Sequence, residues 1–291
     1  MPENDRMKIW SDVEYVYRCL ADEDRTLAFE TSIKELVKPG SIVLDLGTGS
    51  GIMALFAARA GATRVFTVEI GDYLFRTSGK SFTNCGYSST IVPIHRDAMD
   101  LDFSHIEKPD VVICEMITTG LIGEMQGPVI NSLKRSGIID EHTLLVPNDL
   151  TTSLLIVDAD FSFYGMQLSF PVFINYFTKA IDRSYQIYSQ EKIAHKVDFS
   201  SNFEEAVKIH ETIRIEKTGC INGLLLKSST GFVGGASLSP CVSYCQPVIL
   251  PAKRISVKKG DDIIVTVEYS MGEGFDSLEY EVQLFSSNKG I

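Results

Sequence analysis

The sequence predicts an α/β domain built on a parallel sheet, followed by an antiparallel β-barrel domain. Two patterns support this prediction. Through the first half of the 291 residues, apolar strand-like runs alternate with helix-like segments, which is typical of parallel strands joined by crossover helices. After about Pro147 the chain changes to short segments of alternating polarity separated by Gly, Asp and Ser, which is typical of antiparallel sheets.

The first half begins with a helical pattern. Apolar residues recur at helical spacing from Glu14 to Leu36, and the residues KPGS then end this helix. The elements that follow alternate between strand and helix; in order they are "IVLDL", "GIMALFAARA", "RVFTVEI", a helix over about 72–85, "STIVPIH" and "DVVICE". We therefore expect N-terminal helices over residues 1–40 and the α/β domain over residues 41–147.

The second half is expected to form the β-barrel over residues 148–291. Segments such as "TTSLLIVDA", "CINGLLLKSS", "DDIIVTVEYS" and "LEYEVQLF" have the polarity pattern of strands with one buried face. The stretch from Phe161 to Phe203 is rich in Tyr and Phe and fits either helices or a projecting arm.

The composition argues against several classes of protein. A net charge of −11 and a pI near 5.0 disfavour a nucleic-acid partner bound through its phosphates and suit a cationic or neutral substrate. No apolar run approaches the roughly 20 residues that a membrane-spanning helix needs. The six cysteines are scattered and follow no secretory leader, which predicts reduced thiols in a cytoplasmic protein. Cys241 and Cys245 have no matching His or Cys pair, so no metal site is expected.

A glycine-rich turn gives the strongest chemical signal. In "VLDLGTGSG", Gly47, Gly49 and Gly51 lie between a predicted strand and a predicted helix, where the absent side chains let a ligand approach the backbone and the helix N-terminus. This turn alone leaves NAD, FAD and S-adenosyl-L-methionine open as cofactors.

Acidic residues at successive strand ends favour one of these cofactors. Asp45 would repel a pyrophosphate but can accept hydrogen bonds from the ammonium group of a methionine moiety. Glu69 closes the next strand and can accept from both ribose hydroxyls. Asp97 follows the third strand and is expected to border the adenine, with Met99 as apolar cover. Each acid alone also fits an exposed strand end, but the three together predict S-adenosyl-L-methionine.

Two more acids enclose the loop in "DVVICEMITTGLIGEMQGPVINSL". The predicted strand stops at Glu115, and Glu124 follows across an apolar segment that contains Gly120 and Gly123. In a purely structural interpretation, Glu115 ends the strand and Glu124 begins a helix whose dipole it complements. In a functional interpretation, both carboxylates face a ligand at the edge of the sheet.

The segment "VLDLGTGSGIMALFAARAGATRVFTVE" resembles the cofactor segment of class I S-adenosylmethionine-dependent methyltransferases, and specifically of the protein arginine methyltransferase family. This resemblance implies a Rossmann-like first domain. "CLADEDRTLAFETSI" is similar to the helix of that family whose arginine binds the cofactor carboxylate, which implies this role for Arg25. "CEMITTGLIGE" has the spacing of the family's double-glutamate loop, which implies that Glu115 and Glu124 grip a substrate guanidinium. "GFVGGASLSP" and "YCQPVIL" are similar to the family's β-barrel, and a segment around 161–203 docks onto a second subunit in the family, which implies a homodimer.

The sequence departs from the family pattern around the substrate. The loop between the two glutamates lacks the family's tryptophan, and a threonine, histidine, tryptophan triplet is replaced by Val242, Ser243 and Tyr244. Tyr15 is a loose counterpart of an aromatic substrate-binding segment, and Cys19 stands in place of a methionine that faces the substrate. We therefore expect Tyr15, Cys19 and Tyr244 to contact the substrate.

These features predict a methyltransferase that acts on a guanidino nitrogen of arginine, either in a protein or as a small-molecule guanidine. A guanidinium is planar, presents five donors and stays protonated, so carboxylates suit it best. The alternatives are a methyltransferase acting on an oxygen or nitrogen of a small metabolite, and a catalytically inactive, cofactor-binding regulatory subunit.

Overall fold

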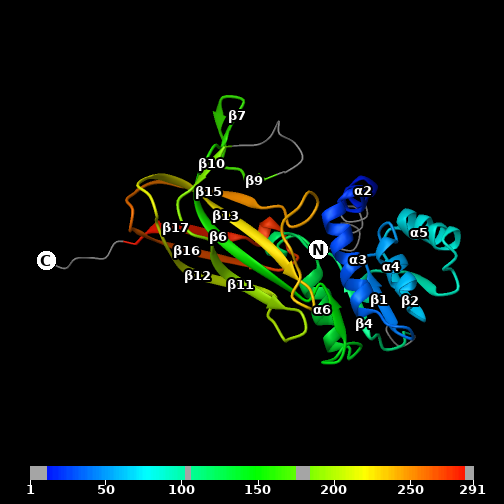
Figure 1. Ribbon diagram of the computed structural model, residues 1–291. Helices are drawn as coiled ribbons and strands as arrows, with labels where there is room; N and C mark the ends of the chain where they lie inside the picture. Colours follow the sequence, from blue (N-terminus) through cyan, green and yellow to red (C-terminus); the bar gives the residue numbers. More distant parts are fainter. Residues whose placement is uncertain (1–11, 102–105, 175–183, 286–291) are drawn as a thin grey trace.

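The computed structural model describes residues 12–101, 106–174 and 184–285. A pair of N-terminal helices and a parallel α/β domain form one end of the molecule, and antiparallel strands form the other (Figure 1). This arrangement confirms the predicted fold class. None of the helices in the described ranges is long and apolar enough to cross a membrane.

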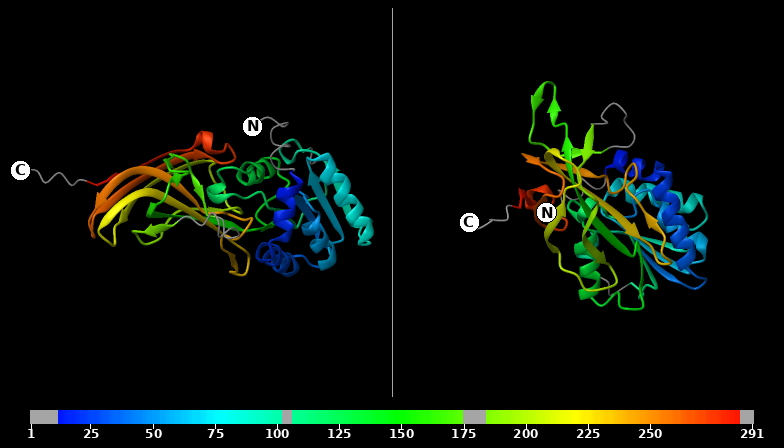
Figure 2. Two further views of the ribbon diagram at one scale, coloured as in Figure 1. Left: turned by 90° about the horizontal axis from the view of Figure 1, so that it is seen from above. Right: turned by 60° about the vertical axis from the view of Figure 1, so that its left-hand side comes forward.

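The first domain is a five-stranded parallel sheet in the order β3-β2-β1-β4-β5. Its strands are β1 (Ile42–Leu46), β2 (Arg64–Glu69), β3 (Ile91–His95), β4 (Val111–Cys114) and β5 (Leu144–Val146). Its helices are α4 (Ile52–Ala60), α5 (Asp72–Asn84) and α6 (Gln126–Arg135). Figures 1 and 2 show α5 at the end of the molecule farthest from the C-terminal strands.

The apolar runs explain why these strands lie inside the sheet. In β1 all residues after Ile42 are buried, as expected for a parallel strand covered on both faces, and Asp45 is the polar exception. Because the strands are parallel, β1, β2 and β4 all end at the same edge of the sheet. Asp45, Glu69 and Glu115 therefore meet there, although 24 and 46 residues separate them along the chain.

The N-terminal region corrects one expectation. Instead of one helix from Glu14 to Leu36, the chain forms α2 (Val13–Ala21) and α3 (Glu23–Leu36), which are separated at Asp22. The Asp22 side chain caps α3 by accepting from the Arg25 backbone N–H at 3.4 Å. An N-cap aspartate adopts an extended backbone, which breaks a helix that the apolar spacing alone would continue.

The second domain is antiparallel. Its larger sheet follows the order β10-β6-β13-β15-β9, with β11 paired to β6 and β14 paired to β13. The strands of this sheet are β6 (Asp149–Ala159), β9 (Val172–Phe173), β10 (Tyr185–Ile187), β11 (Lys192–Asp198), β13 (Gly219–Gly231), β14 (Ser237–Leu238) and β15 (Val248–Val257). A second sheet contains β12 (Ala206–Arg214), β16 (Asp262–Ser270) and β17 (Glu279–Leu284). Parallel pairing ends with β5 and antiparallel pairing starts with β6, on either side of Pro147.

The region expected to hold helices or an arm contains short strands in its described part. A hairpin of β7 (Ser162–Phe163) and β8 (Met166–Gln167) stands away from the β domain (Figures 1 and 2). Large apolar side chains on and near it are exposed, including Tyr164 and Phe170. Part of the expected arm, residues 175–183, lies outside the described residues.

Gly51 offers a direct test of why the glycine-rich turn needs glycine. Its backbone φ is +86°, and a Cβ atom there would lie 2.7 Å from the buried ring of Phe82. Gly86 has a similar φ of +80°, but a Cβ there would meet open space. We expect Gly86→Ala to lower the free energy of unfolding by about 1 to 2 kcal/mol through backbone strain. Gly51→Ala should cost about 1 to 3 kcal/mol more through overpacking. Denaturant unfolding measures both, and equal losses would contradict the packing argument.

Candidate active site

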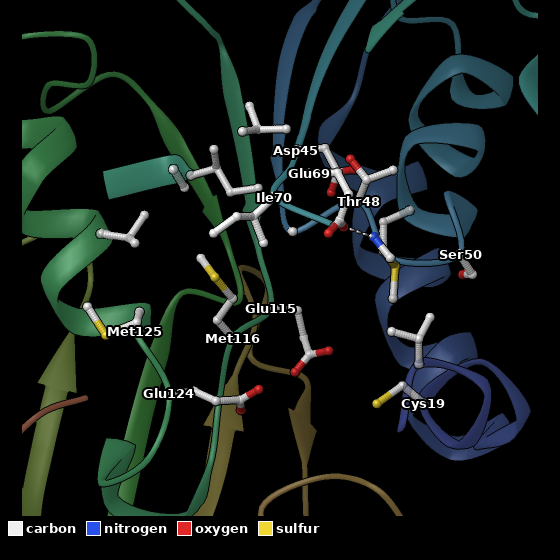
Figure 3. A pocket seen from close by; sticks show the side chains of 18 of the residues that line it. Cys19, Asp45, Thr48, Ser50, Glu69, Ile70, Glu115, Met116, Glu124 and Met125 are labelled. Atoms are coloured by element: carbon white, nitrogen blue, oxygen red, sulfur yellow. Dashed lines mark hydrogen bonds between the residues drawn. The ribbon is translucent and has the colours of Figure 1, made fainter. Parts of the chain in front are cut away.

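A cavity opens at the sheet edge where β1, β2 and β4 end. Most of the predicted site residues line it: Tyr15, Cys19, Arg25, Asp45, Gly47, Gly49, Glu69, Asp97, Met99, Glu115 and Glu124. Figure 3 shows Asp45 and Glu69 at one end of this cavity and Glu115 and Glu124 at the other. Gly51 does not line the cavity, because it begins α4 against Phe82.

Glu69 holds the glycine-rich turn in place. One carboxylate oxygen accepts from the Gly49 N–H at 2.8 Å, and the other accepts from the Gly71 N–H at 2.8 Å. Gly47 and Gly49 both have positive φ, which glycine adopts without strain. Each oxygen of a carboxylate has a second lone pair. Glu69 can therefore fix the turn and still accept from hydroxyl groups in the cavity.

Asp45 is buried beside this turn in a chain of hydroxyl groups. The Thr67 hydroxyl donates to Asp45 at 2.6 Å, and the Thr48 and Thr67 hydroxyl oxygens lie 2.5 Å apart. Burial raises the pKa of Asp45 to about 7, although the Thr67 hydrogen bond acts in the opposite direction. A cationic group in the cavity would favour the charged carboxylate. Asp45 is thus suited to an ammonium ligand.

Asp97 organises the rim of the cavity near the end of β3. Its side chain caps the short 3-10 helix η1 (Ala98–Asp100) by accepting from the Met99 N–H at 2.9 Å. This hydrogen bond fixes the backbone of Met99, and both residues line the cavity.

Arg25 and Glu115 form a buried ion pair. Arg25 Nε donates to Glu115 Oε2 at 2.9 Å, and Arg25 Nη2 contacts the same oxygen. Arg25 Nη1 donates to the Cys19 carbonyl at 3.1 Å. Burial raises the pKa of Glu115, and the Arg25 charge opposes that rise. The sequence predicted both residues for the site, but gave no indication that they bind each other.

Arg25 retains donors that could serve a ligand. Its guanidinium has five N–H groups, and the three hydrogen bonds to Glu115 and Cys19 leave one on each terminal nitrogen, counted over the residues that the structure describes. Each of these N–H groups can donate a charge-assisted hydrogen bond to an anionic ligand. Arg25 can therefore hold Glu115 and an anionic group at the same time.

Glu124 is a buried acid with one carboxylate oxygen available to a ligand. Its side chain is 5% exposed, and Tyr15 donates its hydroxyl to Glu124 Oε1 at 3.3 Å. The buried Oε2 atom has no hydrogen-bond partner within the described part of the chain. Burial, together with the negative charge of Glu115, raises the pKa of Glu124 to about 8.

The structural interpretation of Glu124 as a helix-starting residue is not supported by its position. α6 begins at Gln126 with Met125 as its N-cap, and no side chain caps it. Figure 3 shows the carboxylates of Glu115 and Glu124 pointing toward each other, into the cavity. The two acids therefore form one acidic site, in which Arg25 neutralises the charge of Glu115.

The β domain holds the loop between these acids. Gly120, at φ +68°, donates its N–H to the Ser228 hydroxyl at 2.8 Å and accepts from the Tyr269 hydroxyl at 2.7 Å. Thr119 donates to the Gln246 carbonyl at 2.7 Å. Sequence reasoning missed Ser228 and Tyr269, because they contact Gly120 across 108 and 149 residues and lie in no local motif.

A second cavity adjoins the first, and Tyr15 lines both. Its walls come from the loop after β4, from β9 and from the loop before β15, and they are mainly apolar. They include Ile117, Ile122, Phe173, Val242, Val248 and Phe275.

Tyr244 does not face either cavity, which corrects its assignment to the substrate. Its side chain is fully buried, it donates to the Thr230 hydroxyl at 3.1 Å, and its ring packs edge-on against Phe29. The preceding residue, Ser243, lines the second cavity and donates both its N–H and its hydroxyl to Asp22, at 2.7 and 2.9 Å. These bonds join the N-terminal helices to the β domain. They also contribute to holding the pKa of Asp22 below its usual value, against the effect of burial.

No group of three or more His, Cys, Asp or Glu side chains suited to a metal ion is found among the residues described. The site therefore consists of carboxylates, one buried arginine, hydroxyl groups and a glycine-rich turn.

Comparisons with known proteins agree with this architecture. Residues 26–156 match the family model of the ribosomal protein L11 methyltransferase (PrmA). The chain is 27% identical to an uncharacterized protein of Methanocaldococcus jannaschii over 91% of this chain and 95% of that protein. It is 32% identical to the arginine N(omega)-methyltransferase of Streptomyces achromogenes subsp. streptozoticus, over 50% of this chain and 40% of that protein.

A solved structure extends the similarity of fold to both domains. The Trypanosoma brucei PRMT1 enzyme-prozyme heterotetrameric complex with S-adenosylhomocysteine contains a chain that superposes with a TM-score of 0.76. The sequences are 16% identical, and the match covers 96% of this chain and 95% of that chain. Taken with the family model and the sequence relatives, the cavity at the sheet edge belongs to a class I S-adenosylmethionine-dependent methyltransferase related to the protein arginine methyltransferases and to PrmA.

Proposed function

We propose that this methyltransferase transfers the methyl group of S-adenosyl-L-methionine to a guanidino nitrogen of arginine or of a small guanidine. The observation that supports this proposal most is the buried Glu124 carboxylate, which faces the cavity beside Glu115 with an unused oxygen. The Streptomyces relative is an arginine N(omega)-methyltransferase, which supports the same functional group as the acceptor.

Each chemical group of the cofactor would have a partner among the residues that line the first cavity. The bound cofactor would supply an electrophilic methyl group on its sulfonium sulfur. Asp45 would accept from its ammonium, and the two remaining Arg25 donors would bind its carboxylate. Glu69 would accept from the ribose hydroxyls, and Asp97 and Met99 would border the adenine.

The second cavity would admit the substrate, with Tyr15 and Cys19 near the reacting nitrogen. Glu124 would accept from the guanidinium, and Glu115, held by Arg25, would add negative potential on the other side. Fixing the nitrogen in line with the methyl group can recover roughly 7 to 11 kcal/mol of the barrier. Methylation replaces one N–H proton of the guanidinium, and Glu124 could accept that proton because its pKa is about 8.

We also propose that the protein acts in the cytoplasm and forms a homodimer. All six cysteines are free thiols, as expected in a reducing compartment. The hairpin of β7 and β8 exposes Tyr164 and Met166, and the segment after it exposes Phe170; a second subunit could cover these side chains.

The first prediction concerns the cofactor. Asp45→Asn keeps an acceptor for Thr67 but removes the charge, so S-adenosylhomocysteine should bind about tenfold more weakly or worse, as measured by calorimetry. Asp110→Asn is the matched control, because Asp110 accepts from the Ile42 N–H at the opposite end of the sheet. The Asp110→Asn variant should bind S-adenosylhomocysteine with unchanged affinity. Tight binding of NAD, or equal affinity in the two variants, would contradict the assignment.

The second prediction separates the two glutamates. Glu124→Gln should lower kcat/KM for a guanidino substrate about ten- to a hundredfold, because a charge-assisted hydrogen bond contributes about 1.5 to 3 kcal/mol. It should leave cofactor affinity unchanged. Glu115→Gln should lower both kcat/KM and cofactor affinity, because Arg25 loses its charged partner. Turnover and calorimetry on both variants test this, with Glu141→Gln as a surface control. Near wild-type turnover in both would exclude the carboxylate clamp.

The third prediction is a pH dependence. Because the pKa of Glu124 is about 8, the free enzyme holds this group mainly protonated below that pH. We expect kcat/KM for a cationic guanidine to rise as the pH increases through about 8, and Glu124→Gln to remove this rise. The folded protein also keeps the Glu124 proton, which the unfolded chain releases near pH 4.5. The contribution of Glu124 to the free energy of unfolding should therefore fall as the pH rises from 4.5 to about 8. A pH profile that is identical in the wild type and in Glu124→Gln would assign the titration to another group.

A further inference from the structure

The charge of the residues that line the second cavity is unexpected for a cavity that admits a cationic substrate. Its lining includes no carboxylate, and its only charged lining residue, within the described ranges, is Arg18. A cavity built to bind a flexible, arginine-rich peptide would be expected to carry acids outside the catalytic pair. This cavity instead offers apolar walls and a cation.

Arg18 and Tyr15 occupy one face of α2. They are three residues apart, so their side chains are neighbours on the helix surface, roughly 5 to 6 Å apart at Cβ. Tyr15 marks the inner end, where its hydroxyl donates to Glu124, and Arg18 lies one turn further out. A short ligand could therefore contact the buried carboxylate at one end and the guanidinium of Arg18 at the other.

Arg18 is free to change partners. It pairs with Glu14, four residues earlier on the same helix, at 2.8 Å, and both side chains are largely exposed. Exposed ion pairs of this kind contribute little to stability, so a ligand carboxylate held in the cavity can replace Glu14. A planar guanidinium suits a carboxylate through two parallel hydrogen bonds.

The middle of the cavity would hold the body of such a ligand. Phe173 and Phe275 form an edge-on pair with ring centroids 5.9 Å apart, and both line the cavity with Ile117 and Val248. These side chains suit a short chain of methylene groups, because the transfer of apolar surface out of water is favourable.

We infer that the substrate is a small guanidino carboxylic acid, whose guanidinium binds Glu124 and whose free carboxylate binds Arg18. This inference rests on the proposed guanidino methyl transfer and adds the substrate class and an anion subsite. An arginine inside a protein has no free carboxylate at this position and would leave Arg18 without its ligand.

The test compares three probes on the full-length protein with labelled S-adenosylmethionine: L-arginine, agmatine, which lacks the carboxylate, and an arginine-containing peptide with blocked ends. L-Arginine should have a kcat/KM at least tenfold higher than either of the others. Arg18→Gln should raise the KM for L-arginine about tenfold with little change in kcat, and should leave agmatine unaffected. Arg76→Gln is the matched control, because Arg76 forms a similarly exposed pair with Asp72 four residues away and lines neither cavity.

Two results would overturn the inference in distinguishable ways. If agmatine or the peptide reacts as well as L-arginine, or if Arg18→Gln affects all probes alike, the anion subsite is wrong while guanidino methyl transfer stands. If none of the three is methylated although calorimetry shows S-adenosylhomocysteine bound, guanidino methyl transfer fails, and the subsite fails with it.

Discussion

The buried ion pair between Arg25 and Glu115 is the interaction on which the site depends. It joins α3, which lies outside the sheet, to the residue that follows β4, and so closes the N-terminal helices over the sheet edge. Removing one member of such a pair leaves an uncompensated buried charge, which typically costs about 3 to 5 kcal/mol. The pair also determines which glutamate can bind a cation. It neutralises Glu115 and leaves Glu124 as the carboxylate that a cationic ligand can satisfy.

The β domain contributes the rigidity that this arrangement requires. Tyr269 and Ser228 hold Gly120 from two strands, which fixes the loop that carries Glu124. Ser243 holds Asp22, which sets the break between α2 and α3 and so the direction of Tyr15 and Arg18. Both contacts connect the domains next to the cavities rather than far from them. The second cavity thus lies between the two domains and is formed by both.

The sequence predicted the parts of this protein that depend on local patterns. The apolar run at β1 and the glycine turn after it predicted a buried strand and a ligand-binding turn, and the family comparisons confirm a methyltransferase. The break at Asp22 could not be predicted from apolar spacing, because a capping side chain ends a helix without interrupting its periodicity. The contacts of Arg25 with Glu115 and of Tyr269 with Gly120 join residues 90 and 149 positions apart, so no local motif indicates them. The family resemblance assigns Tyr244 to the substrate, but Val242 and Ser243 are the residues of this triplet that line the second cavity.

The central claim is that a substrate guanidinium binds Glu124 while Arg25 remains on Glu115. A crystal structure of the protein with S-adenosylhomocysteine and the best guanidino substrate tests it most directly. We predict a substrate nitrogen within hydrogen-bonding distance of Glu124 Oε2, with Arg25 Nε still donating to Glu115. A guanidinium bound by Glu115 alone with Arg25 displaced, or a substrate that leaves Glu124 without a contact, would contradict this account.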